Sequence, residues 1–404
     1  MVGGDNMDFK KDFSILNTDI TYLDNAATTL KPVSVVNEIS DYYLKYPANA
    51  NRGDYDISRI VDDKLNEVRE KVKLFINANK KEEIIFTSGT TESLNIIIEG
   101  FFKSYLKAGD EILTTKAEHA ALILPWFNVA SKNGSIVKYI ELNDDLTLSM
   151  ENVKKAITKK TKVISLSHIT NVIGDIRPIK DIIQYAHKQG IIVLVDGAQS
   201  VPHEKVDVTD LDIDFLTFSA HKMLGPTGVG VIYGKEKYLN MLNPVILGGG
   251  MNASFDSLGN VSYKELPEKL EAGTQNLSGI LGFGKALDYL NELGLENIHK
   301  YEVDLKKYAV NKLKKLDNII MYNETIENGI ITFNVKDIFA QDVAMYLNKK
   351  KICVRIGQHC AKILSEVLGV KNTIRVSLYF YNTKEDIDKL CDALNNDNIL
   401  YDSL

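Results

Sequence analysis

The chain alternates between short apolar runs and longer segments in which apolar residues recur every three or four positions. Short runs rich in Val and Ile are typical of buried strands, and the wider spacing is typical of helices with one buried face. Strands are expected at residues 83–87, 111–115, 135–140, 162–167, 191–196 and 215–218. Helices are expected at residues 32–46, 54–75, 88–102, 122–132, 150–157 and 179–188. This alternation predicts an α/β fold with a mainly parallel sheet covered by helices on both faces.

The pattern loosens after Tyr233 and then resumes in a smaller unit. Residues 248–264 are polar and begin with glycines, which predicts a long exposed excursion. Further helices are expected at residues 280–293, 298–316, 340–348 and from 384 on, with strands at 329–335, 352–355 and 373–377. We therefore expect three parts, namely an N-terminal segment (1–20) that contributes to the small domain, a large domain (21–277) and a small α+β domain (278–404). In the helix at 54–75, the face expected to be buried includes Ile57, Ile60, Leu65 and Val68.

Composition is that of a soluble globular protein. The 404 residues are 45% hydrophobic and 25% charged. The net charge is -6, and Lys and Glu are interspersed, so the sequence has no basic region of the kind that binds nucleic acid. No apolar run is long enough to span a bilayer, and the start does not resemble a secretory signal. The cysteines, Cys353, Cys360 and Cys391, are odd in number and lack metal-ligand spacing. We therefore expect no metal site and a reducing compartment, either the cytoplasm or an organelle after removal of a leader.

Polar residues follow the predicted strands at the edge where ligands of such sheets bind. The candidates are Thr90, Thr91, His119, Asn171, Asp196, Gln199, Ser219, His221 and Lys222. The turn at 87–91 combines a strand end, a glycine and hydroxyls at a helix start, so its free N–H groups can bind a phosphate. An ordinary helix N-cap is an equally good interpretation of this segment alone.

Lys222 and Asp196 are the two candidates that point most specifically to one kind of chemistry. A buried lysine has a lowered pKa and can form a Schiff base near neutral pH, although a lysine after a strand is more often a surface residue. Asp196 ends a buried strand and requires a cationic partner, either a structural one or a protonated ring nitrogen. Together the two residues fit pyridoxal phosphate, and His119 could stack on its ring and move protons.

These motifs together resemble the aminotransferase class V family of fold-type I pyridoxal-phosphate enzymes, and within it the cysteine desulfurases of the SufS type. The resemblance extends from about Asp24 to the last helix. It implies a seven-stranded sheet in a large cofactor-binding domain with a smaller α+β domain. The motifs that carry it are Tyr22-Leu-Asp-Asn-Ala-Ala, Ser88-Gly-Thr-Thr-Glu, Glu118-His, Ser167-His-Ile-Thr-Asn171, Val195-Asp-Gly-Ala-Gln199, Ser219-Ala-His-Lys222, Glu271-Ala-Gly-Thr274, Arg355-Ile-Gly-Gln-His-Cys360-Ala361 and Arg375-Val-Ser-Leu.

The resemblance implies a role for each candidate around pyridoxal 5'-phosphate. Lys222 is the expected Schiff-base lysine, Asp196 the partner of the ring nitrogen, and Gln199 a donor to the phenolic oxygen. The phosphate contacts are expected from Thr90, Thr91, Ser219 and His221, with Thr274 reaching in from the other subunit of a homodimer. His119 is the expected stacking acid and base, and Asn171 contacts both ring and substrate.

The resemblance also makes Arg375 the clamp on the substrate carboxylate. A guanidinium suits a carboxylate because it offers two parallel N–H donors, and arginine is scarce in this chain. Arg355 is assigned to the substrate as well, although a structural ion pair is an equally good interpretation of it.

Cys360 decides the activity. It follows Gly357-Gln-His359 with Arg355 close by, and a polar, cationic setting favours a reactive thiolate, whereas Cys353 and Cys391 lie in apolar patterns. The resemblance implies that Cys360 attacks the sulfur of L-cysteine, keeps it as a persulfide and releases alanine. The short segment around Cys360 implies a sheltered thiol that passes sulfur to an acceptor of the SufE or SufU type for iron–sulfur cluster assembly.

Other activities of the family remain open on these residues. A selenocysteine lyase, an aminotransferase or a kynureninase-like enzyme would keep Lys222 and Asp196 without needing Cys360, and a catalytically silent assembly scaffold would need none of the three. The chain also departs from the SufS pattern, because Asn51 stands where many such sequences have a histidine before the Arg-Gly pair.

Overall fold

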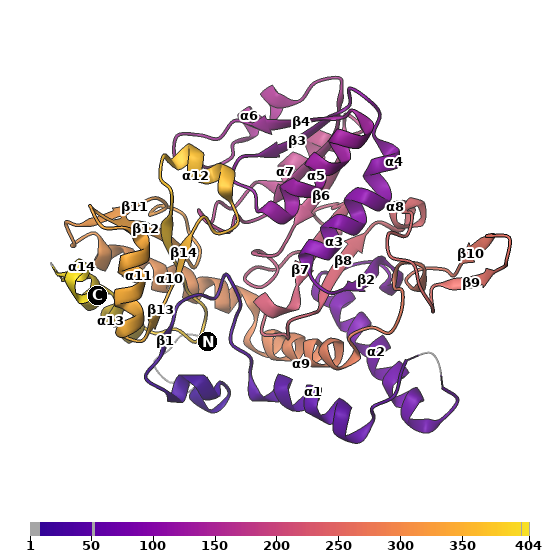
Figure 1. The fold of residues 1–404 in the computed structure, drawn as a ribbon, viewed down its shortest axis with the longest axis horizontal. Coiled ribbons are helices and arrows are strands. Elements are labelled where there is room, and N and C mark those ends of the chain that lie inside the picture. Colours follow the sequence, from indigo (N-terminus) through magenta and orange to yellow (C-terminus); the bar gives the residue numbers. More distant parts are fainter. Residues whose placement is uncertain (1–8, 51–52, 397, 404) are drawn as a thin grey trace.

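A seven-stranded sheet forms the centre of the molecule (Figure 1). The computed structural model describes residues 9–50, 53–396 and 398–403. The strands of this sheet are β2 (Ile84–Thr87), β3 (Glu111–Thr115), β4 (Ile136–Ile140), β5 (Thr161–Ser167), β6 (Ile192–Asp196), β7 (Phe215–Ser219) and β8 (Gly230–Gly234). Their order is β2-β8-β7-β6-β5-β3-β4, and β8 runs antiparallel to both neighbours. The predicted mainly parallel sheet is confirmed, and the strands other than β8 end at one common edge.

Helices cover both faces of the sheet, as predicted. Successive sheet residues alternate between two apolar clusters: Val193 and Val195 of β6 pack in one, and Ile192 and Leu194 in the other with Trp126. One face carries α2 (Asp56–Phe75), α6 (Met150–Ala156), α7 (Ile179–His187) and α9 (Leu277–Leu293), with α1 (Val33–Lys45) packed against α9. The other carries α3 (Thr90–Ile97), which continues through a π-helical turn (Ile98–Phe102) into α4 (Lys103–Tyr105), together with α5 (Ala120–Asn133) and α8 (Glu236–Met241).

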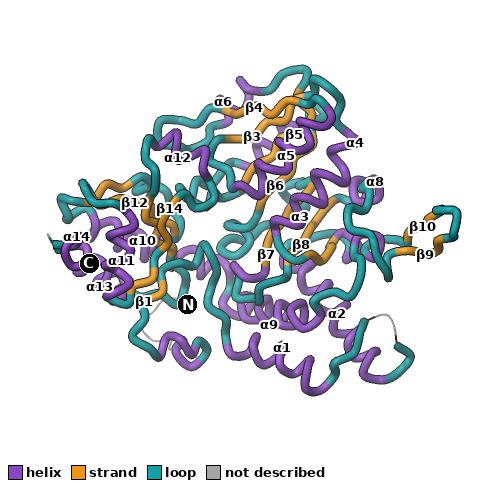
Figure 2. Tube along the Cα trace, viewed as in Figure 1, coloured by secondary structure: helices purple, strands orange, loops and turns teal. Residues whose placement is uncertain are grey.

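A four-stranded antiparallel sheet forms the second, smaller unit (Figure 2). Its strands, in order across the sheet, are β11 (Ile319–Met321), β12 (Ile330–Val335), β15 (Thr373–Ser377) and β14 (Arg355–Gly357). Around it lie α10 (Leu295–Leu313), α11 (Ala340–Lys349), α12 (Lys362–Leu368), α13 (Lys384–Leu394) and α14 (Ile399–Ser403). The short strand β1 (Thr21–Tyr22) pairs with β13 (Ile352–Cys353) beside this unit, so an N-terminal segment joins the C-terminal part of the chain there. The domain boundaries at 20 and 277 stay predictions.

Two local features differ from expectation. In α2, Leu65 and Val68 are buried, but Ile57 and Ile60 are 39% and 43% exposed, so the expectation for them is wrong. Val61 is the residue that faces the apolar cluster in these first turns. The exposed excursion at 248–264 contains a hairpin that the sequence did not predict, formed by β9 (Asn252–Phe255) and β10 (Val261–Tyr263), and it projects from the body of the molecule (Figure 1).

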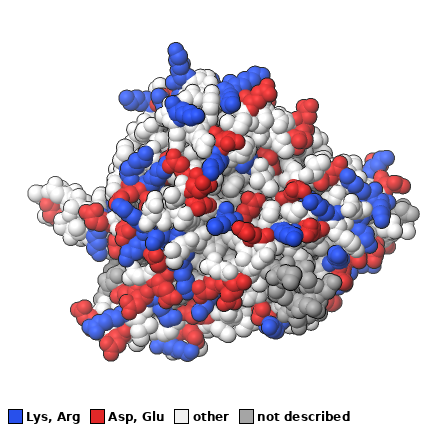
Figure 3. Space-filling view, turned by 180° about the vertical axis from the view of Figure 1, so that it is seen from behind, with Lys and Arg blue, Asp and Glu red and all other residues white. Residues whose placement is uncertain are grey.

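The surface carries charges of both signs. On the face turned toward the reader in Figure 3, Lys and Arg side chains are interspersed with Asp and Glu. Within the described part of the chain, no helix combines the length and the apolar composition needed to cross a bilayer.

Candidate active site

A cavity of about 440 Å³ lies where the parallel strands of the large sheet end and the small unit approaches. The predicted site residues that line it are Thr90, Thr91, His119, Asn171, Asp196, Gln199, Ser219, His221, Lys222, Arg355, Cys360 and Arg375. Thr274 lies outside it, in a neighbouring hollow that shares Ser88 and Glu92 with the cavity. Asn51 lies outside the described residues, so the structure says nothing of that departure from the family pattern.

Lys222 and Asp196 reach the cavity from neighbouring strands. Lys222 ends a single 3-10 turn that follows β7, and Asp196 is the last residue of β6, paired in register with Thr217. Burial lowers the pKa of Lys222 to about 8, because the ammonium loses its hydration, while Asp196 and Cys360 act in the opposite direction. Burial likewise raises the pKa of Asp196 to about 6, opposed by the Ala198 N–H that donates to Oδ1 at 2.9 Å. Each charge therefore makes the other less costly to bury.

The turn before α3 is held tightly against the sheet edge. The backbone N–H of Thr90 donates to Oγ of Ser219 at 2.7 Å, and the two hydroxyls are also 2.7 Å apart. A Cβ at position 230 of β8 would lie 2.4 Å from Cα of Gly89, so only glycine permits this approach. The start of α3 thus opens into the cavity with Thr91 beside it, an arrangement suited to binding a phosphate.

His119 is fixed as a neutral ring at the start of α5. Its Nδ1 accepts the Ala121 N–H at 3.1 Å, so the ring proton lies on Nε2. Burial, with help from the nearby Lys222 and Arg375 charges, lowers the pKa of His119 to about 4. The ring can therefore donate a hydrogen bond from Nε2 while remaining uncharged at neutral pH.

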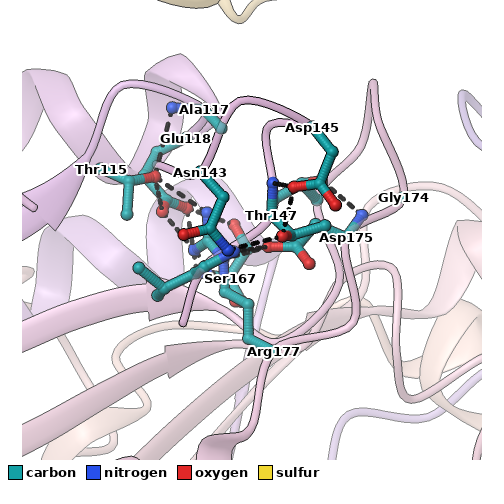
Figure 4. Close-up of polar contacts among 12 residues, drawn as sticks. Thr115, Ala117, Glu118, Asn143, Asp145, Thr147, Ser167, Gly174, Asp175 and Arg177 are labelled. Atoms are coloured by element: carbon teal, nitrogen blue, oxygen red, sulfur yellow. Dashed lines mark hydrogen bonds and ion pairs between the residues drawn. The ribbon is translucent and has the colours of Figure 1, made fainter. Parts of the chain in front are cut away.

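A buried ion pair supports this end of the sheet (Figure 4). Glu118 pairs with Arg177, and both side chains are fully buried. The Glu118 carboxylate also accepts the Ser167 N–H at 2.9 Å, the Ser167 hydroxyl at 2.6 Å and the Thr115 hydroxyl at 2.7 Å. These contacts join the ends of β3 and β5 to the residue before His119. The sequence analysis did not predict this network. The signal that could have revealed it is the presence of two charged residues, Glu118 and Arg177, next to predicted strand ends.

Arg375 enters the cavity from β15. Its NH2 group pairs with Asp24 at 3.1 Å, and its NH1 group donates to the carbonyl of Asn171 at 2.9 Å. Its Nε, like Oδ1 of Asn171 and Oε1 of Gln199, is buried without a partner among the described residues. Unpartnered buried polar atoms are costly, so all three mark a place for a polar ligand. Asp24 was not predicted as a site residue, although it belongs to the Tyr22-Leu-Asp motif.

Cys360 lines the same cavity as Lys222. The expected attack of Cys360 on a substrate held near Lys222 requires this proximity. Cys360 is exposed, so the expectation of a sheltered thiol is wrong for this chain, whereas Cys353 is half-buried and Cys391 is buried. Burial raises the pKa of both other thiols, that of Cys391 to about 11, which keeps them protonated. Arg355 stands directly opposite Arg375 in the β14–β15 register, so two guanidinium-bearing residues lie beside the thiol.

The residues fit pyridoxal 5'-phosphate. The cavity holds a buried amine of lowered pKa for the aldehyde, a buried carboxylate for the ring nitrogen and a helix start for the phosphate. The unpartnered Oδ1 of Asn171 and the neutral His119 ring lie around the same space.

Comparison with known proteins agrees with this geometry. The model of the aminotransferase class-V family matches residues 21–390. A probable cysteine desulfurase of Halalkalibacterium halodurans is 43% identical and is matched over 96% of each chain. Another from Staphylococcus epidermidis is 42% identical over 95% of this chain and 94% of that protein.

Solved structures show the same fold over nearly the whole chain. The cysteine desulfurase CsdA of Escherichia coli superposes with a TM-score of 0.91 at 34% identity, covering 97% of this chain and 98% of that chain. A cysteine desulfurase of Thermococcus onnurineus gives a TM-score of 0.93 at 36% identity, covering 98% of each chain. The chain therefore belongs to the aminotransferase class-V family.

Proposed function

We propose that this chain is a pyridoxal-phosphate-dependent cysteine desulfurase that converts L-cysteine to L-alanine and keeps the sulfur as a persulfide on Cys360. The observation that carries the proposal is that an exposed thiol, Cys360, lines the same cavity as the buried amine of Lys222. The relatives named above, which are cysteine desulfurases matched over nearly their full length, support it.

The cofactor would be held by Lys222 at its aldehyde, by Asp196 at its ring nitrogen, and by Thr91, Ser219 and His221 at its phosphate. When bound, pyridoxal phosphate supplies an electron sink for the substrate α-carbon. Gln199 donates through Nε2 to the Ala26 carbonyl at 2.8 Å, so its second N–H is the one that could reach the phenolic oxygen. Thr90 is already bonded to Ser219 and acts chiefly on the shape of the turn.

The substrate would be oriented by Arg375. Its Nε and the second hydrogens of NH1 and NH2 remain available to the substrate carboxylate, while Asp24 and Asn171 fix the plane of the guanidinium. Arg355 contributes positive charge beside it. The free amine of Lys222 removes the α-proton, and its lowered pKa makes the uncharged form available at neutral pH.

The sulfur step belongs to Cys360. Its thiolate attacks the substrate sulfur, so that a sulfur–sulfur bond forms and the bond between sulfur and the β-carbon breaks. The electron pair of the broken bond stays with the β-carbon, which takes up a proton from solvent, and the ammonium of Lys222 returns a proton to the α-carbon. One cysteine and one thiol thus become one alanine and one persulfide, with no external oxidant or reductant.

We propose further that the persulfide passes to an acceptor protein of the SufE or SufU type for iron–sulfur assembly, in the cytoplasm. The segment that carries Cys360 spans only residues 358–361 between β14 and α12, and is too short to carry the sulfur far. An acceptor must therefore come to the cavity.

The working form is proposed to be a homodimer. Large apolar side chains on α1, α2 and the segment after α8 are exposed, including Leu44 at 80% and Leu247 at 67%, and such groups of exposed side chains mark protein interfaces. Thr274 lies outside the cavity of its own chain, where it accepts from Asn49 at 3.2 Å. We therefore propose that Thr274 contributes to the cavity of the partner subunit.

Replacement of Cys360 by alanine tests the activity. The variant is expected to bind the cofactor and L-cysteine but to lose alanine formation by at least ~1000-fold, because no other thiol lines the described cavity. The matched control is Cys353→Ala, which removes a thiol outside the cavity and should leave turnover within ~2-fold. Unchanged turnover in Cys360→Ala would instead indicate a class V activity that does not use this thiol, such as that of a selenocysteine lyase.

A further inference from the structure

The segment that carries Cys360 has an unfavourable backbone conformation. His359 and Cys360 both lie in the left-handed region, with φ of 50° and 57°. Residues with a Cβ avoid this region, and two in succession persist only where their surroundings hold them. Something in the structure must therefore keep the two residues in this conformation.

His359 makes the contacts that can do this. Its side chain is buried, and its Nε2 lies 2.9 Å from the hydroxyl of Thr373, the first residue of β15. Its carbonyl accepts the side-chain N–H of Asn171 at 2.8 Å. On the other side of the turn, the Cys360 carbonyl accepts the N–H of Ala120 at 2.7 Å. The segment is thus fastened at both residues to the walls of the cavity.

We propose that His359 is a positioning residue for the Cys360 thiol: its imidazole, bound to Thr373, holds the left-handed turn that keeps the thiol at the cavity. This inference deepens the proposed function and rests on it. Asn171 adds a second link, since its side chain binds His359 while its carbonyl binds Arg375. The position of the nucleophile is therefore tied to the group that would bind the substrate carboxylate.

The contact between His359 and Thr373 does not depend on protonation in the working pH range. The charged groups that act on the ring are Arg375 of β15 and Arg355 of β14. Burial and these two arginines lower the pKa of His359 to about 3. The ring is therefore neutral wherever the folded enzyme works, and Nε2 can share one hydrogen with the Thr373 hydroxyl.

A matched pair of substitutions at Thr373 tests the proposal in the full-length protein with its cofactor. Thr373→Val removes only the hydroxyl in a buried position, and Thr373→Ser keeps it. With the valine variant, we expect persulfide formation on Cys360 in a single turnover to slow by ~10- to 100-fold, because a displaced nucleophile loses reactive geometry. KM for L-cysteine and the cofactor absorbance should change by less than ~2-fold, and the serine variant should match the wild type.

Hydrogen–deuterium exchange provides a second readout that does not require turnover. The amides of residues 357–361 and of Ala120 should exchange faster in Thr373→Val than in Thr373→Ser. His359→Leu removes the same bond from the other side and should reproduce both changes. An unchanged persulfide rate or unchanged exchange in the valine variant would overturn the proposal. If the wild type itself forms no persulfide, the proposed function fails, while the exchange data still decide whether His359 holds the turn.

Discussion

At the scale of single residues, the site depends on two buried groups of opposite charge. Lys222 alone would be read as a surface lysine, and Asp196 alone as half of a structural ion pair. The structure brings both to the cavity and moves their pKa values toward each other, to about 8 and about 6. This shift makes an uncharged amine available while the carboxylate is still ionised.

The rate at which the cofactor-free protein takes up pyridoxal phosphate should rise with pH. Lys222 is protonated below its pKa of about 8 and loses its proton above it, so the reactive amine increases through that range. Asp196 is protonated below its pKa of about 6, which removes the ring partner at the acid end. Stopped-flow absorbance at a series of pH values measures this rate. An uptake rate that is constant or falls between these two pKa values would contradict the assignment, and Lys222→Ala, with no amine to react, serves as the control.

Asp196→Asn should move the midpoint of this pH profile downward. The carboxylate favours the charged form of Lys222, so removing its charge lowers the pKa of the lysine further below about 8. The same substitution should reduce turnover by ~100-fold or more, since the ring nitrogen loses its ionic partner. The uptake profile and kcat are to be compared with those of Asp210→Asn, which changes an exposed carboxylate. A midpoint that stays in place would show that Asp196 does not act on Lys222.

At the scale of elements, the buried pair of Glu118 and Arg177 joins two strand ends to the helix that begins after His119. Removing one partner of a fully buried pair leaves the other charge without its close counter-ion, and Arg177 then keeps only Asp175, at 3.5 Å from its Nε. Glu118→Gln should therefore lower the free energy of unfolding by ~3–5 kcal/mol, measured by urea denaturation. The exposed pair of Lys180 and Asp210 is the control, and Asp210→Asn should cost less than ~1 kcal/mol. Equal effects of the two substitutions would contradict a special role for the buried pair.

The periodicity of apolar residues predicted most elements because burial on both sheet faces imposes it. It failed where a residue's environment depends on distant parts of the chain. Ile57 and Ile60 continue the helical spacing of α2, yet Val61 is the residue that meets the core. The Arg375–Asp24 pair joins residues at opposite ends of the sequence, so no local pattern could reveal it. The left-handed turn at His359 depends on Thr373 in the same way.

At the scale of the whole molecule, the site is proposed to be completed by a second subunit through Thr274. A mixed dimer tests this, combining one Lys222→Ala chain with one Thr274→Val chain. The valine variant alone should hold the cofactor about 10-fold more weakly, as expected for one lost hydrogen bond. In the mixed dimer, the site that keeps Lys222 receives an intact Thr274 from its partner, so it should bind the cofactor as the wild type does. Weak binding in the mixed dimer would show that Thr274 acts within its own chain.

The central claim is that Cys360 receives sulfur from L-cysteine in a cavity served by Lys222. The most direct test is to incubate the cofactor-loaded protein with L-cysteine, measure its intact mass and map the modified peptide, while alanine is measured in solution. We expect one added sulfur on Cys360 for each alanine in a single turnover, and none in Lys222→Ala. Alanine without added sulfur, or sulfur on Cys353 or Cys391 instead, would contradict the account.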